Sequence, residues 1–110
     1  MPKKTVPTPD HLSAEAAQWW RSVVEAYQLE PHHMKLLRLA CEAYDRTQQA
    51  RAEIDRDGIT VPAGESVKAH PAVAIERDSR LAFARILREM DLDVEAPQDR
   101  RPPALRSNRR

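Results

Sequence analysis

The stretch between Pro31 and Gly58 most constrains what this chain can fold into. Proline is tolerated at the first position of a helix and glycine is a common stop, so the sequence predicts one helix over residues 31–57. At 1.5 Å per residue, a helix of that length extends roughly 40 Å. Its apolar residues spread over roughly 160° of the helix surface, which is wider than the stripe of a helix that packs on one side. We therefore expect a long central helix with neighbours on two sides. Its apolar residues are Leu36, Leu37, Leu39, Ala40, Ala43, Tyr44, Ala50 and Ile54.

Two further segments show helical periodicity. One begins near Ser13, whose side chain can cap the free N–H groups of a first turn, and ends at Leu29-Glu30-Pro31. The other is expected to begin at Pro71 and to run to about Met90. The first segment repeats Ala16, Trp20, Val23, Val24 and Tyr27 on one stripe, with Trp19 beside it. The second places on one face Ile75, Ser79, Ala82, Phe83, Ile86, Leu87 and Met90.

These segments predict an all-α fold with three main helices, one of them long and central. Residues 59–70 contain two short β-favouring runs around Pro62-Ala63-Gly64-Glu65, which fit a small hairpin or an extended loop. The helical domain is expected over residues 12–96, after a flexible N-terminal arm at residues 1–11. Residues 97–110 carry five arginines against one aspartate, and we expect this basic tail to be disordered in isolation.

The residue inventory excludes several kinds of chemistry. Cys41 is the only cysteine, which rules out an internal disulfide bond and a cysteine-rich zinc site. The chain has 2 glycines, too few for a glycine-rich phosphate loop. His32 and His33 point about 100° apart on a helix, so they offer no regular metal site with Cys41. We expect no metal and no other cofactor.

Acidic residues stand mostly four residues from an arginine, as in the pairs Glu76–Arg80 and Arg85–Glu89. This spacing is typical of a solvated helix face rather than of paired catalytic carboxylates. The sequence therefore predicts that the protein is not an enzyme. No apolar run approaches the ~18–20 residues that a membrane span needs, and the first ten residues do not resemble a secretory signal, so we expect a soluble protein.

The helix expected at residues 71–90 carries a basic face opposite its apolar face. Arg77, Arg80, Arg85 and Arg88 spread over roughly 140° of it, and Leu81 lies among them. Arginine suits phosphate because its planar guanidinium pairs with two oxygens, so these four residues are candidate DNA contacts. A solvated face partly neutralised by neighbouring acidic residues explains the same pattern, and the residues alone do not decide between the two.

At this point the pattern resembles the small subunit of phage terminases, a family of tailed phages and prophages. The family often ends its last helix with a glycine, whereas this chain has Asp91-Leu92 there. The residues that carry the resemblance are Leu12-Ser13-Ala14-Glu15-Ala16 with Trp19-Trp20, then Leu37, Ala43-Tyr44-Asp45-Arg46, Ala50 and Ile54 before Gly58-Ile59, His70-Pro71-Ala72-Val73, Leu87-Arg88-Glu89-Met90-Asp91-Leu92, and Leu105-Arg106-Ser107-Asn108.

The resemblance implies a non-enzymatic packaging protein of the host bacterial cytoplasm. Such subunits form homo-oligomeric rings, recognise double-stranded viral DNA, and recruit or regulate the large subunit that carries the ATPase and nuclease. From this resemblance, we expect the four arginines of the helix at residues 71–90 to contact the phosphate groups of DNA. The tail contacts would come from Arg100, Arg101, Arg109 and Arg110. Candidate contacts between subunits are Trp19, Tyr44 and Leu81.

Three alternatives stay open at this stage. A small helical transcriptional regulator would bind a palindromic site, most simply as a dimer. A protein–protein adaptor would act through the tail alone, without DNA. A metal-dependent enzyme would use His32, His33 and Cys41.

Overall fold

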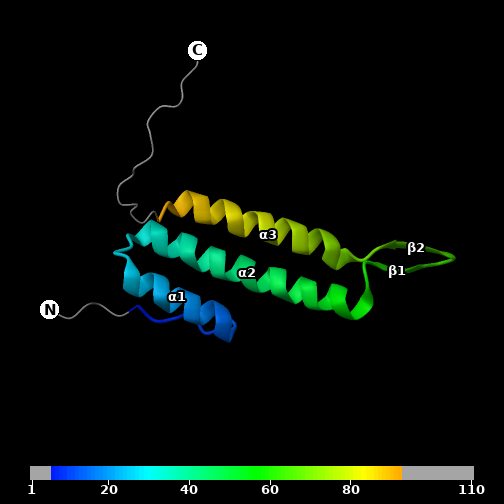
Figure 1. The fold of residues 1–110 in the computed structure, drawn as a ribbon, viewed down its shortest axis with the longest axis horizontal. Helices are drawn as coiled ribbons and strands as arrows, with labels where there is room; N and C mark the ends of the chain where they lie inside the picture. The colour runs from blue at the N-terminus through cyan, green and yellow to red at the C-terminus, as the bar shows by residue number, and fades with distance from the viewer. Residues whose placement is uncertain (1–5, 93–110) are drawn as a thin grey trace, which may run out of the picture.

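A computed structural model describes residues 6–92 of the chain (Figure 1). Three helices lie side by side with alternating direction, and the long second helix lies between the other two. The expected all-α architecture is confirmed, and residues 59–70 form a hairpin rather than an extended loop. In chain order the elements are α1 (Ala14–Ala26), α2 (Pro31–Asp57), β1 (Thr60–Ala63), β2 (Ser66–Ala69) and α3 (Pro71–Met90).

Helix α1 begins where the sequence predicts but ends earlier. Ser13 is its N-cap, and the side-chain oxygen accepts a hydrogen bond from the N–H of Ala16 at 3.1 Å. The helix ends at Ala26, because Tyr27 takes an extended conformation with φ −130° and ψ 156°. The prediction of an end at Leu29-Glu30-Pro31 was wrong by three residues. Proline restricts only the residue before it and does not require a helix to continue up to that point.

Helix α2 has the predicted bounds. At its end the N–H of Gly58 donates to the carbonyl oxygen of Ile54 at 2.6 Å. Gly58 has φ 89° and ψ 175°, a combination that is essentially open to glycine alone. This conformation turns the chain out of the helix and into β1. The end of α3 uses a different residue, because Asp91 takes the left-handed conformation (φ 49°, ψ 45°) that a glycine would adopt more easily.

The hydrophobic core lies at the end of the molecule where all three helices meet. Helix α1 has 13 residues and α2 has 27, so α1 covers only the first half of α2 (Figure 1). Because α1 stops there, the core is built from α1, the first half of α2 and the end of α3. Its buried residues are Ala16, Trp20, Val23, Leu37, Cys41 and Met90.

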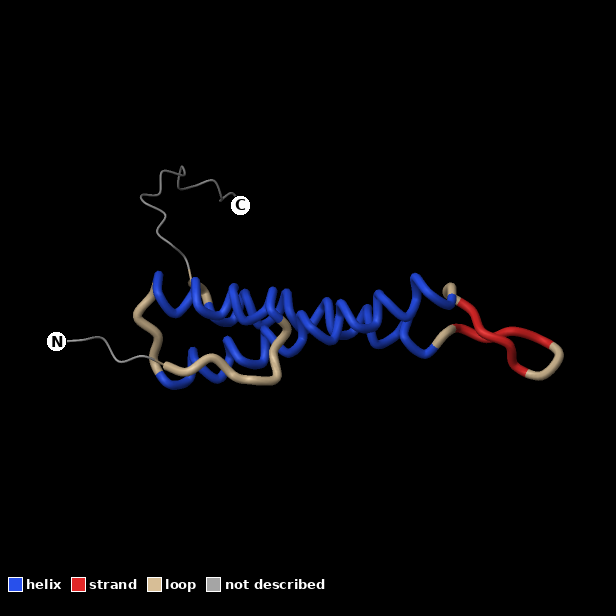
Figure 2. Tube along the Cα trace, turned by 90° about the horizontal axis from the view of Figure 1, so that it is seen from below, coloured by secondary structure: helices blue, strands red, loops and turns tan. Residues whose placement is uncertain are grey.

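Beyond this core, residues 46–79 form a two-helix extension that we call the distal arm. Its helices are the second half of α2 and the first half of α3, and the β1–β2 hairpin extends past them (Figure 2). The arm buries only small or polar side chains, so it has little apolar core of its own. The buried residues of the arm are Ala50, His70, Ala72 and Glu76.

His70 fixes the hairpin to the helices. Its backbone N–H donates to the carbonyl of Ile59 at 2.9 Å, and its ring Nδ1 accepts from the N–H of Ala72 at 3.0 Å. Because Nδ1 accepts, Nε2 carries the proton and donates to Asp57, with 3.0 Å between Nε2 and Oδ2. His70 therefore joins three parts of the fold: its imidazole bonds the last turn of α2 and the first turn of α3, and its backbone N–H bonds Ile59 at the base of the hairpin.

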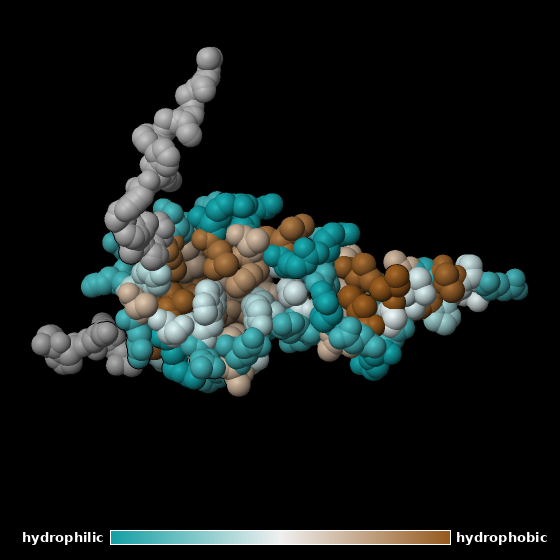
Figure 3. All heavy atoms as spheres, in the orientation of Figure 1, coloured by the Kyte–Doolittle hydropathy of each residue, from teal (hydrophilic) through white to brown (hydrophobic). Residues whose placement is uncertain are grey.

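Several apolar side chains expected on inward faces are exposed. Leu39 is 52% exposed, Ile75 45% and Leu87 36%, although periodicity places all three on apolar faces. The predictions for these three were wrong, because α3 packs mainly against α2 and α1 covers only the first half of α2. Figure 3 shows apolar side chains gathered over the paired helices and again near the base of the hairpin.

Candidate nucleic-acid interface

The basic face of α3 lies on its outward side. His70 caps the helix and Pro71 occupies its first turn, so the sequence sets where the helix starts and hence which side chains point outward. All four candidate arginines are exposed, and Leu81 among them is 50% exposed. The arginines are Arg77, Arg80, Arg85 and Arg88. The structure thus places them together on one surface.

Two of these arginines are engaged with acidic side chains. Arg77 pairs with Asp78 at 3.2 Å, next to it in the chain. Arg80 pairs at 3.3 Å with Glu76, which also accepts from Arg51 of α2 at 2.9 Å. The hydrogen bond from Arg51, followed by that from Arg80, holds the pKa of Glu76 below its ordinary value. Glu76 therefore links α2 to α3, and Arg80 contributes to that link.

Arg85 and Arg88 differ from Arg77 and Arg80 in their pairing with acidic side chains. Within residues 6–92 neither forms an ion pair, and the Arg85–Glu89 pair that the spacing favours is not formed. The two side chains are three residues apart, so they lie on the same side of the helix, with Leu81 between them in angle. This part of α3 presents two exposed guanidinium groups that form no ion pair with any carboxylate of the described residues.

The candidate interface residues do not form one patch. Trp19 packs edge-on against Phe83 with 5.7 Å between ring centroids, and Tyr44 lies 5.7 Å from the same ring. All three rings are half-buried and come from three different helices. Leu81 points to the opposite side of α3 from Phe83, since two residues are 200° apart on a helix. Sequence reasoning found Trp19 and Tyr44 but missed Phe83, whose helical position assigned it only to the core.

Sequence reasoning also missed a shallow groove between α2 and α3. It has a volume of about 390 Å³, and both apolar and charged side chains line it. The wide apolar arc of α2 was the available signal, because it is wider than the stripe that one neighbouring helix covers. The groove is lined by Leu39, Glu42, Ala43, Arg46, Asp78, Ser79, Ala82 and Ile86.

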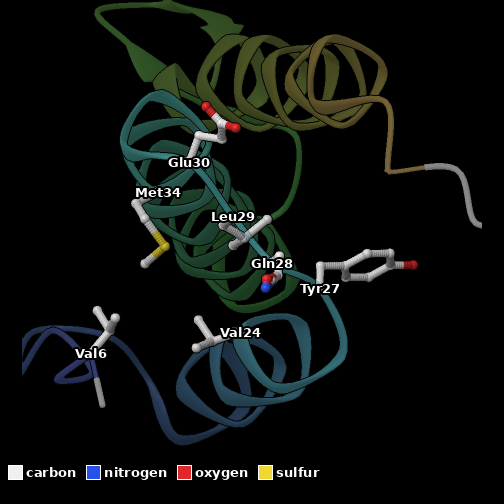
Figure 4. A pocket seen from close by; sticks show the side chains of 7 residues that line it. All are labelled: Val6, Val24, Tyr27, Gln28, Leu29, Glu30 and Met34. Carbon is white, nitrogen blue, oxygen red and sulfur yellow. The ribbon is translucent and has the colours of Figure 1, made fainter. Parts of the chain in front are cut away.

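A second hollow lies where the segment before α1, residues 6–12, meets the core. This segment runs beside α1 (Figure 1), and Val6 packs against the core cluster. Figure 4 shows three side chains facing one another: Val6 from the segment before α1, Val24 from α1 and Met34 from α2. The hollow, about 480 Å³, is wide and open, and the extended residues 27–30 form its other wall.

The histidine and cysteine candidates for metal chemistry are placed apart. Cys41 is buried, and burial, together with Asp45 and Glu42, raises the pKa of its thiol to about 12. The rings of His32 and His33 stack at 4.2 Å between centroids on the first turn of α2. Among residues 6–92, no three histidine, cysteine or acidic side chains gather as metal ligands would.

The fold and its outward arginines define the class: a three-helix protein with a projecting hairpin and a cationic helix face. The family model of the phage terminase small subunit matches residues 16–103. The chain therefore belongs to the phage terminase small subunit family, and its role is in phage DNA packaging. Neither the curated proteins nor the solved structures give a match.

Two further expectations from the sequence concern the basic tail and membrane-spanning helices. The tail arginines Arg100, Arg101, Arg109 and Arg110 lie outside the described residues. In the part of the chain that the structure describes, no helix is both long enough and apolar enough to cross a membrane.

Proposed function

We propose that this chain is the non-catalytic DNA-recognition subunit of a phage packaging machine, and that α3 contacts the phosphate backbone of double-stranded viral DNA. The single observation that carries the proposal is the exposed pair Arg85 and Arg88, which no described carboxylate neutralises. Family membership supports it. Arg77 contributes at the edge of this surface, and Arg80 in part, because Glu76 competes for its guanidinium.

Two arginines per chain give only weak affinity for DNA, so the proposal needs several copies. A homo-oligomeric ring repeats the α3 face around one axis, and linked sites bind far more tightly than single ones. A ring arises when one surface of a subunit binds a different surface of the next. The exposed apolar residues Leu39 and Ile75 on the α2–α3 flank offer one such surface. Leu81 offers a further contact between copies at the edge of the arginine face.

The tail is the second basic part of the chain in this proposal. Its arginines Arg100, Arg101, Arg109 and Arg110 add electrostatic attraction that does not depend on DNA sequence. The terminase large subunit, which carries the ATPase and nuclease of such machines, is the proposed protein partner. The host bacterial cytoplasm is the proposed place of action.

The test is DNA binding at several salt concentrations, with the oligomer mass measured by light scattering. The double variant Arg85→Ala/Arg88→Ala is compared with Arg21→Ala/Lys35→Ala, which removes two exposed positive charges from α1 and α2. The slope of log K against log salt is negative, and each lost phosphate contact reduces its magnitude by about 0.9. We expect the α3 variant to reduce that magnitude by about 1.8 for each subunit that contacts DNA, and the control to leave it nearly unchanged.

Equal losses in both variants would show that attraction is general and that α3 is not the contact surface. Unchanged oligomer mass in both variants is required, so that a lost ring is not mistaken for a lost contact. A protein that binds no DNA at low salt would refute the proposal and favour an adaptor that acts through its tail.

A further inference from the structure

The half-buried aromatic rings of the three helices form a small crevice that the proposed DNA surface does not use. It has a volume of about 190 Å³ and is lined by Glu15, Ala16, Trp19, Tyr44 and Phe83. Trp19 and Tyr44 each lie 5.7 Å from Phe83, with interplanar angles of 63° and 56°. The rings are therefore tilted against one another and form the walls of the crevice.

The rim of the crevice is acidic. The hydroxyl of Tyr44 donates to Oε2 of Glu15 at 2.5 Å, which holds the carboxylate beside the aromatic walls. Aromatic faces attract cations, and a carboxylate adds a charged partner. A planar guanidinium fits such a site better than an ammonium group, because it can stack on a ring and still donate to a carboxylate.

The chain itself supplies guanidinium groups close to this crevice. Leu92, the last described residue, packs against the core cluster that also contacts Trp19 and Tyr44. Phe83 lies seven residues before Met90, so the crevice is roughly 10 Å along α3 from the helix end. Beyond Leu92 every basic residue is an arginine, the first being Arg100. Eight extended residues reach up to about 26 Å, which is more than the return path needs.

We propose that the crevice between Trp19, Tyr44 and Phe83 binds an arginine side chain from the C-terminal segment, residues 97–110, of the same chain. Charge favours this occupant, because the segment carries five arginines and one aspartate, while residues 11–96 carry more acidic than basic side chains. A covalently attached segment also acts at a millimolar effective concentration, which makes a weak single contact sufficient.

The test uses the full chain labelled with 5-fluorotryptophan, which gives two ¹⁹F resonances, for Trp19 and Trp20. Trp19→Phe assigns them. Trp20 is 4% exposed in the core and serves as an internal reference. The main variant changes the five tail arginines to glutamine: Arg100, Arg101, Arg106, Arg109 and Arg110. We expect the Trp19 resonance to shift and the Trp20 resonance to stay.

Two controls make the result specific. Lys35→Gln/Lys68→Gln removes two exposed positive charges that do not line the crevice, and it is expected to move neither resonance. In a Phe83→Leu background, which removes one wall, the tail variant is expected to cause no further shift of Trp19. An unmoved Trp19 in the tail variant, or an equal shift with the lysine control, would overturn the proposal.

A mixing experiment tests whether the occupant comes from the same chain. Labelled tail variant is mixed with an excess of unlabelled wild-type protein, under conditions that allow subunits to exchange. The proposal expects the Trp19 resonance to stay at the position of the variant. A return to the wild-type position would mean that a neighbouring copy's tail fills the crevice, and would overturn the assignment to the same chain.

Discussion

Leu37 and Leu39 offer a matched comparison within one helix. The two leucines stand two residues apart in α2, so the same substitution to alanine changes helix propensity equally at both sites. Leu37 is 0% exposed and belongs to the core cluster, whereas Leu39 is 52% exposed on the flank of the α2–α3 groove. Any difference between the two variants therefore measures packing rather than helix formation.

The magnitude follows from what each side chain buries. Leu37→Ala removes three buried carbon atoms, worth about 2.4 kcal/mol at about 0.8 kcal/mol per methylene, and leaves a cavity that adds to this cost. Met90 and Trp20 line the same cluster, and the flexible thioether of Met90 can fill part of the space. We expect Leu37→Ala to lower the free energy of unfolding by about 3 kcal/mol. Leu39→Ala should cost below about 1 kcal/mol.

Urea unfolding followed by circular dichroism measures both values. With a denaturant slope of about 1–3 kcal/mol/M, the Leu37 variant should unfold at a urea concentration about 1–3 M lower than wild type. The measurement is made at two protein concentrations, since Leu39 is also a proposed contact between copies. If Leu39→Ala costs as much as Leu37→Ala in dilute monomer, the helix packing described here is wrong.

Three further results are expected. Gly58→Ala should cost about 1–3 kcal/mol, measured by thermal unfolding, because φ 89° strains any other residue even though no atom lies within 4 Å of an added Cβ. Cys41 should resist alkylation at pH 8 in folded protein and react after unfolding, as followed by mass spectrometry, since burial raises its thiol pKa to about 12. Hydrogen bonds from Arg56 and then His70 lower the pKa of Asp57, and those from Arg51 and then Arg80 lower that of Glu76. Both carboxylates therefore stabilise the fold at neutral pH, and urea midpoints should fall as pH drops below about 4.5.

The bounds of the elements could be predicted because local residues determine them. Pro31, Gly58 and Pro71 act on the backbone within one turn, so their positions alone place both ends of α2 and the start of α3. Around Gly64, which takes φ 65° in its turn, the sequence indicated a small hairpin or an extended loop and did not decide between them. Ser13 likewise identified the start of α1 through its cap.

Burial and the side-chain partners that lie far apart in the sequence could not be predicted, because they depend on which helix covers which flank. Leu39 satisfies the apolar pattern of α2, but its side chain is 52% exposed in the described part of the chain. Arg80 was predicted to contact DNA, yet it shares Glu76 with Arg51, which is 25 residues away from Glu76 in sequence. The contact between Trp19 and Phe83 joins residues 64 positions apart, and no local pattern signals it.

The short reach of α1 has a consequence for how firmly the two ends of the molecule are held. In the distal arm, opening exposes little apolar surface, because the arm buries only Ala50, His70, Ala72 and Glu76. Local opening should therefore start at the hairpin and proceed along α2 and α3 towards the three-helix end. Amide hydrogen exchange would be fastest in the arm, with protection rising sharply where α1 begins to cover α2. A neighbour bound against the arm would slow that exchange, so assembly and local folding would be thermodynamically coupled.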